Sequence, residues 1–313
     1  MARRYVLPTL LWLVLVYALF QLVERFPPME RWWGFLTPDR LAAIAWFAVL
    51  FVVANLLRAL RFGILVRSSV PVGWPAVLTT FPWLFMIGAL TPFRLGEGLR
   101  AVWIRKYGGS SGEAIGFMVG ERALDLLMLL VLGVLGLVLA PSTGDMSPVI
   151  PAIVLAGAAA ALVAATAMGP RLAAIAGRYG PLARLGVPQM ILAIGFLRRR
   201  HLGAATIGLS IVIWLVGALS FYIPLYAMVG VASIGGAFLS IAAVNLIRIV
   251  SPAPGNIGSY QAAMVAALLL YRVSAEDGLI VAVLLQVAML TMLVAQGFAA
   301  RLVSLAAGLD NRG

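Results

Sequence analysis

The sequence predicts an all-α polytopic membrane protein with two inverted repeats, each carrying a re-entrant, broken-helix hairpin. Three observations predict this fold class. The 313 residues are 63% hydrophobic and only 11% charged, which is too little charge for a water-facing surface. The apolar residues form stretches of membrane-spanning length, and proline and glycine interrupt two of them. The two halves of the chain also resemble each other, and their charges indicate opposite orientations.

Six apolar stretches are predicted to be full spans, because a helix needs about 20 apolar residues to cross a bilayer. They lie near residues 5–23, 41–66, 114–140, 149–168, 203–229 and 278–304. The first of them lacks a small-residue cleavage site, so we expect a retained helix and not a signal peptide.

Two further apolar stretches, 75–106 and 236–271, are broken near their middles. The breaks are Pro92 and Gly96 in the first stretch, and Pro252, Pro254, Gly255 and Gly258 in the second. Each half is too short to cross the membrane alone, so the two stretches predict four half-helices. Their irregular backbone must be buried or line a wet cavity. The alternative is that proline and glycine only kink packed helices.

Basic residues gather in alternate loops, which the positive-inside rule places in the cytoplasm. They include Arg3, Arg4, Arg58, Arg61, Arg67, Arg100, Arg105, Lys106, the arginines of 170–201, Arg301 and Arg312. Both termini are then cytoplasmic, 170–201 is a basic interfacial segment, and the two hairpins enter from opposite faces. The net charge of +12 fits basic loops against anionic lipid, so no nucleic acid is expected.

The internal similarity divides a single transmembrane domain, residues 1–313, into repeat one (about 41–140) and repeat two (about 203–304). The motif Pro92–Gly96 matches Pro254–Gly258. A second, ungapped frame pairs Glu113 with Asp277, Glu121 with Leu285, Arg122 with Gln286 and Gly133 with Gly297. Charge and similarity therefore predict the inverted-repeat layout of many transporters, with the substrate site near the midplane.

Charged residues inside the apolar stretches predict that site, because one at a helix centre costs about 2.5–3.5 kcal/mol on insertion scales. The candidate head-group residues are Arg94, Gly96, Glu97, Arg100, Glu121, Arg122, Asp125, Arg248, Asn256, Gly258 and Gln261. The half-helices that begin near Leu95 and Ile257 would point free N–H groups and positive dipole ends at the centre, which favours an anion such as a lipid phosphate.

Glu121 and Asp125 are i and i+4, so they share one helix face and need a cation between them. The expected cations are Arg94, Arg100 and Arg248. Arg122 is expected to point elsewhere, and Asn256 to be a turn residue or a neutral hydrogen-bonding group like Gln261. The alternative is a buried ion network that only pins the first hairpin to the following helix.

The composition also limits the chemistry. The chain has no cysteine, which excludes disulfides and thiolate chemistry, and one histidine, His201, which excludes a histidine-rich metal site. We expect no metal, no cofactor and no catalytic residue, because no nucleophile–histidine pair is evident.

Four motifs carry a resemblance to a known family. They are Arg58-Ala-Leu-Arg61, Arg94-Leu-Gly-Glu97-Gly-Leu-Arg100, Glu121-Arg122-x-x-Asp125 and Pro254-Gly-x-x-Gly258. Together they resemble the transmembrane, flippase-type domain of bacterial lysylphosphatidylglycerol synthases and its stand-alone relatives, over roughly residues 41–304. The resemblance implies a lipid translocator in the bacterial inner membrane.

Two departures from that family matter. Family members often have a glutamate after the second Pro-Gly motif, where this chain has Ser259-Tyr260-Gln261. This weakens the expectation of a cationic, lysine-like head group near Gln261. The chain also shows no soluble aminoacyl-transfer domain, so a separate lipid-synthesising enzyme is an expected partner.

The expected function is a flippase or transporter for a phosphate-bearing polar lipid, of the aminoacyl-phospholipid, glycolipid or polyprenyl-phosphate type. The alternatives are a membrane-embedded lipid phosphatase or transferase, and a non-catalytic partner that hands lipid to a synthase.

Overall fold

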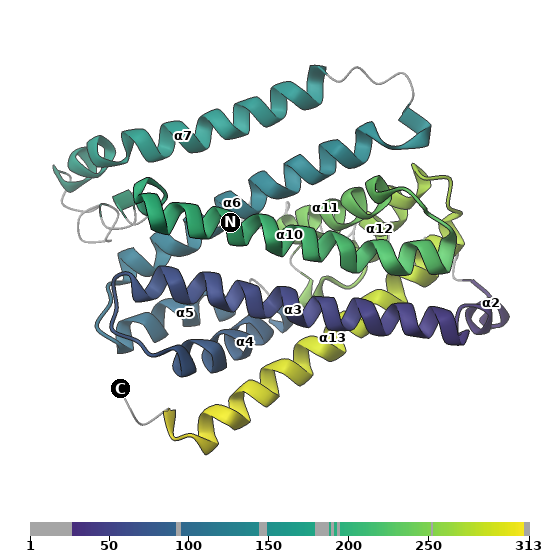
Figure 1. The fold of residues 1–313 in the computed structure, drawn as a ribbon, viewed down its shortest axis with the longest axis horizontal. Helices are drawn as coiled ribbons and strands as arrows, with labels where there is room; N and C mark the ends of the chain where they lie inside the picture. Colours follow the sequence, from purple (N-terminus) through teal and green to yellow (C-terminus); the bar gives the residue numbers. More distant parts are fainter. Residues whose placement is uncertain are drawn as a thin grey trace, which may run out of the picture.

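The structure is a computed structural model that describes residues 27–91, 95–143, 149–178, 188, 191–192, 195–251 and 253–309 (Figure 1). This part of the chain is helical and contains no β-strand. The longer helices are α3 (Pro38–Arg67), α4 (Trp74–Leu90), α5 (Leu95–Lys106), α6 (Ser111–Val138), α7 (Val149–Arg178), α10 (Arg200–Val229), α11 (Ile234–Val250), α12 (Ser259–Leu269) and α13 (Ala275–Ala306). The short ones are α2 (Met29–Gly34), η2 (Pro141–Thr143), η3 (Gly195–Arg198) and η4 (Pro254–Asn256).

The all-helical membrane fold class is confirmed. Among the described helices α3, α10 and α13 are long and apolar enough to cross a membrane by length and composition. Helix α6 has 28 residues but carries three charged residues in its middle. Helices α6 and α7 begin within three residues of their predicted starts. The predicted span 5–23 lies outside the described residues.

Local sequence signals set several helix ends. Pro38 occupies the first turn of α3, where its missing N–H is tolerated. Ser110 and Glu113 form a capping box at the start of α6, and the Ser274 side chain caps α13. Helix α10 ends at Val229, and the next residue, Gly230, has a φ of 69°, the left-handed conformation that glycine adopts without steric cost.

Both broken stretches form pairs of short helices, as predicted. Helix α4 ends at Leu90 and α5 begins at Leu95, while α11 ends at Val250 and α12 begins at Ser259. The second break passes through three residues with positive φ, namely Gly255 (64°), Asn256 (57°) and Gly258 (84°). Asn256 is therefore a turn residue, consistent with the tolerance of asparagine for this conformation.

The helices of the two halves pack reciprocally. In the predicted repeats α3 corresponds to α10, α4 to α11 and α6 to α13. Helix α3 packs against its counterpart α10. Helix α4 packs against α13, the counterpart of α6, and α6 packs against α11, the counterpart of α4. Helices α3 and α10 run antiparallel, and the two hairpins open toward opposite ends of the molecule (Figure 1). This is the arrangement that inverted repeats produce. The repeat boundaries themselves stay a prediction.

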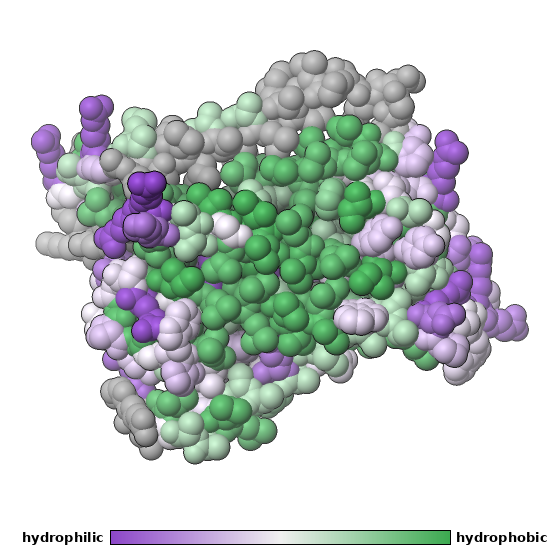
Figure 2. Space-filling view, in the orientation of Figure 1, coloured by the Kyte–Doolittle hydropathy of each residue, from purple (hydrophilic) through white to green (hydrophobic). Residues whose placement is uncertain are grey.

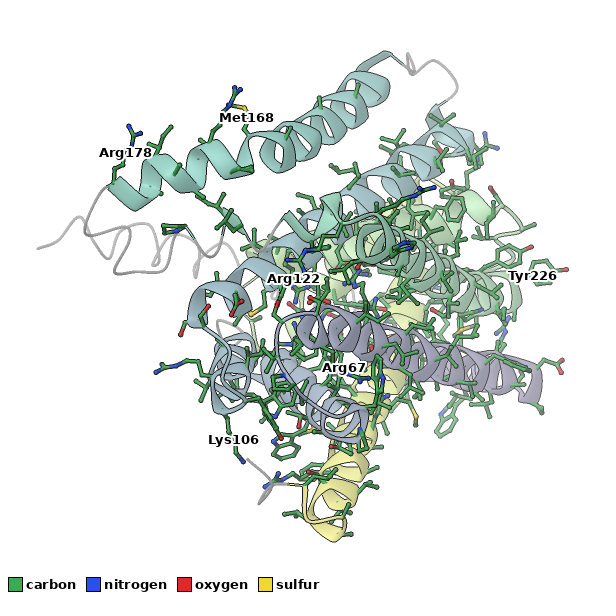
Figure 3. All side chains as sticks on the ribbon, turned by 60° about the vertical axis from the view of Figure 1, so that its left-hand side comes forward. Arg67, Lys106, Arg122, Met168, Arg178 and Tyr226 are labelled. Atoms are coloured by element: carbon green, nitrogen blue, oxygen red, sulfur yellow. The ribbon has the colours of Figure 1, made fainter. Side chains whose placement is uncertain are left out.

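The surface separates into an apolar band and two polar ends. Figure 2 shows a continuous hydrophobic face with hydrophilic residues gathered at both ends. The carboxyl ends of α3, α5 and α7 lie at one end, and bring Arg67, Lys106 and Arg178 there (Figure 3). At the other end Arg31 forms ion pairs with Glu276 and Asp277. One strongly basic end and one end of mixed sign agree with the predicted loop charges.

Two predicted positions need correction. The charge pattern placed Arg58 and Arg61 in a cytoplasmic loop, whereas the apolar length placed them in the span 41–66; the structure agrees with the span, because α3 continues to Arg67 and holds both inside the helix. Helix α7 continues to Arg178, so the beginning of the predicted interfacial segment 170–201 extends a long helix. Most of that segment's remainder lies outside the described residues.

Candidate functional site

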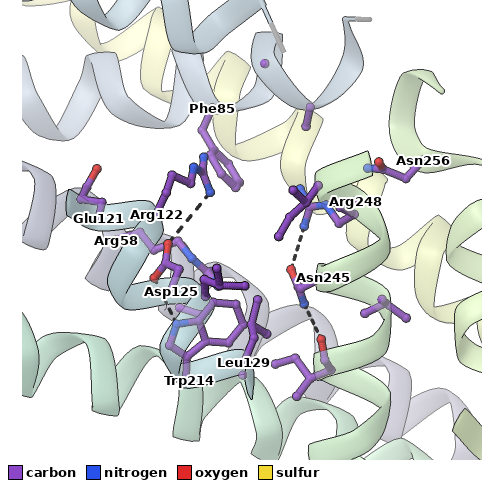
Figure 4. A pocket seen from close by; sticks show the side chains of 18 of the residues that line it. Arg58, Phe85, Glu121, Arg122, Asp125, Leu129, Trp214, Asn245, Arg248 and Asn256 are labelled. Atoms are coloured by element: carbon purple, nitrogen blue, oxygen red, sulfur yellow. Dashed lines mark hydrogen bonds and ion pairs between the residues drawn. The ribbon is translucent and has the colours of Figure 1, made fainter. Parts of the chain in front are cut away.

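A cavity of about 640 Å³ lies between the two hairpins (Figure 4). It is lined mainly by α3, α4, α6, α10, α11 and the second break, and by single residues of α5, α12 and α13. Its charged lining residues, within the described part of the chain, are Arg58, Arg61, Arg100, Glu121, Arg122, Asp125 and Arg248. The hairpin helix α4 also contacts η4, so the first hairpin reaches the break of the second. Chain segments from both halves thus enclose one cavity, whose lining combines apolar residues with these charged side chains.

Arg61 is the centre of the ion network. Its Nη1 lies 2.7 Å from Oδ1 of Asp125, and its Nη2 donates to Oδ2 at 3.0 Å, a bidentate pair. Nη1 also donates to the Ser210 hydroxyl at 2.8 Å. The Arg61 residue is only 2% exposed and Asp125 only 8%. This pair joins α3, α6 and α10 through charge-assisted hydrogen bonds.

Glu121 lies between two arginines. Its Oε1 is 3.4 Å from Nε of Arg61, and its Oε2 is 3.6 Å from Nη1 of Arg100. The Arg100 guanidinium lies 4.6 Å from the Phe62 ring centre and 4.4 Å from that of Phe81. Such cation–π contacts are strongest where water is excluded, and Arg100 is 5% exposed. Glu121 therefore links the first hairpin to α6, as its pairing with Arg100 was predicted to do.

Trp214 and Arg58 lie on the same wall of the cavity as Arg61, Glu121 and Asp125. The indole Nε1 of Trp214 donates to Oδ1 of Asp125 at 3.1 Å. The guanidinium of Arg58 lies 5.4 Å from the Trp214 ring centre, and its Nη1 donates to Oδ1 of Asn55 at 3.1 Å. Asn55 in turn donates to Gln296 of α13 at 3.2 Å. Arg58 is thus positioned by a neutral amide and an aromatic ring.

Arg122 does not point elsewhere. It lines the cavity, and its Nη1 lies 4.0 Å from Oδ2 of Asp125 (Figure 4). One turn of helix separates the two residues, so they share a face although Arg122 is next in sequence to Glu121. The expectation was wrong because residues three positions apart on a helix approach as closely as residues four apart.

Arg248 lies on the opposite wall. Its Nη1 donates to Oδ1 of Asn245 at 3.2 Å, and the Asn245 amide donates to the Ile241 carbonyl at 2.8 Å. Figure 4 shows the Arg248 and Asn245 side chains on α11 facing Arg122 and Asp125 across an open space. Arg248 was expected to serve as a cation for the two carboxylates, and its hydrogen bond to Asn245 lies within α11.

The second break is closed by amides. The Gln261 Oε1 accepts from the Gly258 N–H at 2.7 Å, and its Nε2 donates to Oε1 of Gln286. Gln286 donates from its own Nε2 to the Gly255 carbonyl at 2.9 Å. Gln261 and Gly258 are not among the residues that line the cavity, whereas Asn256 is. The Gly258 N–H is therefore bonded within the protein, not offered to a ligand.

Positive charge exceeds negative charge in the cavity. Among its described lining residues there are five arginines and two carboxylates, which leaves an excess of three positive charges. The described residues contain no group of three or more His, Cys, Asp or Glu side chains placed to hold a metal ion. The arrangement can bind an anionic group through guanidinium N–H donors, which match phosphate geometry bidentately.

A comparison with known protein families agrees with the motifs. The model of the lysylphosphatidylglycerol synthase TM region matches residues 5–297. The chain belongs to this family. No curated protein and no solved structure matches it. The family match covers α3 to α12 completely and α13 as far as residue 297, and it confirms the resemblance seen in the sequence.

Some predicted site residues cannot be placed. In this family member Arg94 lies outside the described residues, as does the Glu97 side chain, and Gly96 lies in the first turn of α5. The lining residues that were not predicted include four whose polar side chains bond at the cavity wall, namely Arg58, Arg61, Trp214 and Asn245. The signal for the first two was present in the motif Arg58-Ala-Leu-Arg61, since residues three apart share a helix face. Trp214 gives no such signal among eight tryptophans.

Proposed function

We propose that this protein translocates a phosphate-bearing lipid across the bacterial inner membrane through the cavity between its two hairpins. The observation that carries the proposal is the arginine-rich cavity, which lies in an otherwise apolar helical membrane protein of a lipid-handling family. A lipid phosphate is the anion that such a protein meets in the bilayer, and several arginines give it hydrogen-bond donors.

The arrangement of the hairpins supports translocation. They open toward opposite ends, and transporters built this way move a central site between two access states by rocking one repeat against the other. The cavity volume of about 640 Å³ is typical of small-molecule pockets and accommodates a lipid head group. The acyl chains would then lie among the apolar helices or in the surrounding lipid.

Reconstitution into liposomes tests the proposal. Purified protein should move fluorescent phospholipids between leaflets faster than protein-free liposomes do, measured by chemical quenching of the outer leaflet. Asp125→Asn should abolish this movement because it removes the charge that orients Arg61 and Arg122, while the uncharged side chain keeps the space filled. The variant should remain folded and extractable, which size-exclusion chromatography checks.

Two other results would contradict the proposal, and a third would change only the role of Asp125. Formation of a chemically altered lipid would indicate a phosphatase or transferase. Lipid binding with no movement for any lipid tried would indicate a protein that hands lipid to a synthase. Loss of folding in Asp125→Asn would assign the carboxylate to the structure of the protein and leave transport to be tested with other cavity variants.

A further inference from the structure

Arg58 is held by neutral partners, unlike Arg61 and Arg100. Its Nη1 donates to Oδ1 of Asn55 at 3.1 Å, and its guanidinium lies 5.4 Å from the Trp214 ring centre. Within the described part of the chain no carboxylate forms an ion pair with it. An amide oxygen and a ring face orient a guanidinium without neutralising its charge.

Arg61 and Arg100 are engaged by carboxylates. Arg61 forms the bidentate pair with Asp125, and Nη1 of Arg100 lies 3.6 Å from Oε2 of Glu121. The Arg61 and Arg100 residues are 2% and 5% exposed, whereas Arg58 is partly exposed and lines the cavity. The first two arginines therefore join helices, while Arg58 borders the space that a ligand would occupy.

Asp125 lies on the same wall as Arg58 but accepts from other donors. Its Oδ1 accepts from Arg61 and from the Trp214 indole, and its Oδ2 accepts a second bond from Arg61. Trp214 contacts both groups, because its N–H binds the carboxylate and its ring faces Arg58 (Figure 4). Asp125 thus acts as the counter-ion of Arg61 and not of Arg58.

A chain of amides fixes the position of Arg58. Asn55 is 1% exposed, and its Nδ2 donates to Oε1 of Gln296 on α13 at 3.2 Å. This bond turns the Asn55 oxygen toward Arg58, because the donor and the acceptor of an amide lie on opposite sides. The Nε2 of Gln296 is buried and has no hydrogen-bond partner among the described residues. Arg58 is therefore positioned from α13 through two neutral side chains.

An arginine with neutral partners is costly inside a membrane protein. Helix α3 is apolar and long enough to span a bilayer, and a charge within such a helix is normally paired or functional. A ligand that carries a phosphate supplies the negative charge, and a guanidinium binds phosphate through two parallel N–H donors. The adjacent cavity of about 640 Å³ gives the space for such a group.

We infer, as a refinement that rests on the proposed function, that Arg58 binds the phosphate group of the substrate and that Asn55 and Gln296 are its positioning residues. Arg61 and Arg100 keep a structural role in this assignment. The phosphate then compensates a cation for which the described part of the protein provides no carboxylate.

Ligand-induced stabilisation of Arg58→Gln tests this assignment. Short-chain phosphatidic acid should raise the unfolding temperature of the detergent-purified protein, and short-chain diacylglycerol, which lacks the phosphate, should raise it less. In Arg58→Gln the dissociation constant for phosphatidic acid should increase at least about tenfold, because a charge-assisted pair is lost. The unfolding temperature without ligand should not fall below that of the control variant, because no ion pair inside the protein is broken.

The matched control is Arg67→Gln on the same helix. Arg67 also lies over a tryptophan, 4.7 Å from the Trp74 ring centre, but it is exposed and does not line the cavity. This variant should bind phosphatidic acid as the unchanged protein does. The comparison removes any general effect of losing one arginine from α3.

Asn55→Asp tests the assignment with Arg58 in place, and it replaces Arg58→Gln if that variant does not fold. The new carboxylate compensates Arg58 inside the protein, so phosphatidic acid should bind at least about tenfold more weakly. Gln296 can donate its Nε2 to the carboxylate after an amide flip, which keeps the contact with α13. Unchanged binding in Asn55→Asp would show that Arg58 only packs against Trp214.

Inorganic phosphate shows which part of the ligand is recognised. Stabilisation by inorganic phosphate that is lost in Arg58→Gln supports a site for the phosphate group itself. Stabilisation by phosphatidic acid alone, lost in the same variant, supports a site that also requires the lipid chains. If either ligand stabilises Arg58→Gln as strongly as it stabilises the unchanged protein, the assignment to Arg58 is overturned.

Transport in liposomes separates this assignment from the proposed function. Arg58→Gln should move fluorescent phosphatidylglycerol at least about tenfold more slowly than Arg67→Gln does. If the two variants bind phosphatidic acid and move lipid equally, the assignment is overturned and transport stands. If no lipid moves but Arg58→Gln alone loses the phosphate-dependent stabilisation, the proposed function fails and the assignment stands. Absence of movement and of stabilisation overturns both.

Discussion

The two hairpins share an outline but are joined to their neighbouring helices by different chemistry. The first meets α6 through ions, with Arg100 of α5 facing Glu121. The second meets α13 through amides, with Gln261 of α12 bonded to Gln286. The second hairpin shows that neutral hydrogen bonds are enough to hold a broken helix inside this protein. The charges around the first are therefore not required by the architecture.

The matched positions sharpen this difference. In the predicted repeats Glu121 corresponds to Leu285, which is completely buried in the apolar core. Placing a carboxylate at such a depth requires partners, and Arg61 and Arg100 supply them. The first half of the protein thus has a buried ion-network residue at a position where the second half has a leucine, and the cavity lies beside that network.

Arg61→Ala should have the largest effect. It removes the cation that holds both carboxylates, and breaking a buried ion pair in this way destabilises a protein by about 3–5 kcal/mol. The unfolding temperature in detergent, followed by tryptophan fluorescence, measures the loss. Arg67→Ala is the control on the same helix, because that arginine is exposed. An Arg61→Ala protein as stable as the control would show that the network does not hold the helices together.

Gly136→Ala should have the next largest effect. A Cβ at Gly136 of α6 would lie 2.5 Å from the Leu239 backbone nitrogen and 2.8 Å from its Cα, so the backbone of α11 would have to move. Overpacking against backbone should cost about 3 kcal/mol, the upper part of the usual range. The matched control is Gly133→Ala one turn earlier, where the nearest atom, Ala242 Cβ, would be 3.3 Å away.

Glycine variants also compare the α6–α11 contact with the reciprocal α13–α4 contact. Gly133 of α6 faces Ala242 of α11, and its predicted repeat partner Gly297 of α13 faces Met86 of α4. Gly297→Ala should be milder than Gly136→Ala, because its close neighbour is a flexible methionine side chain. Equal thermal destabilisation by Gly136→Ala and Gly133→Ala would contradict this account of the α6–α11 contact.

Gln286→Leu should have a smaller effect and should separate structure from transport. It removes the bonds to Gln261 and to the Gly255 carbonyl, and burying these groups without partners costs about 1–3 kcal/mol. The unfolding temperature should fall, while the ratio of transport rates between lipids should not change, because Gln286 does not line the cavity. A changed lipid preference would mean that the amide-closed break takes part in recognition.

The sequence was sufficient for the helices but not for the full ion network. Apolar length, proline and glycine located the α3, α10 and α13 spans and both breaks, because these features depend on local residues. The partner of Asp125 was missed because Arg61 was assigned to a loop by counting basic residues. An arginine that continues a helix looks the same in sequence as one that follows it.

Contacts between distant segments explain the other differences. Trp214 reaches Asp125 from α10, a pairing that depends on how α6 and α10 pack. Gln261 was predicted to line the cavity, but its side chain donates a hydrogen bond to Gln286 of α13. Neither pairing leaves a periodic or compositional signal, so sequence alone could name polar residues but not decide which of them face one another.

The smallest effect is expected for Arg100→Lys, which tests whether the first hairpin depends on charge or on guanidinium shape. Lysine keeps the charge that Glu121 faces but loses the flat contact with Phe62 and Phe81. We expect a destabilisation of about 1 kcal/mol and a transport rate close to that of the unchanged protein. Arg100→Gln removes the charge as well and should reduce both stability and transport more strongly. If the two variants behave alike in thermal unfolding and liposome transport, the aromatic contact and not the ion pair joins the first hairpin to its surroundings, and the contrast with the second hairpin narrows accordingly.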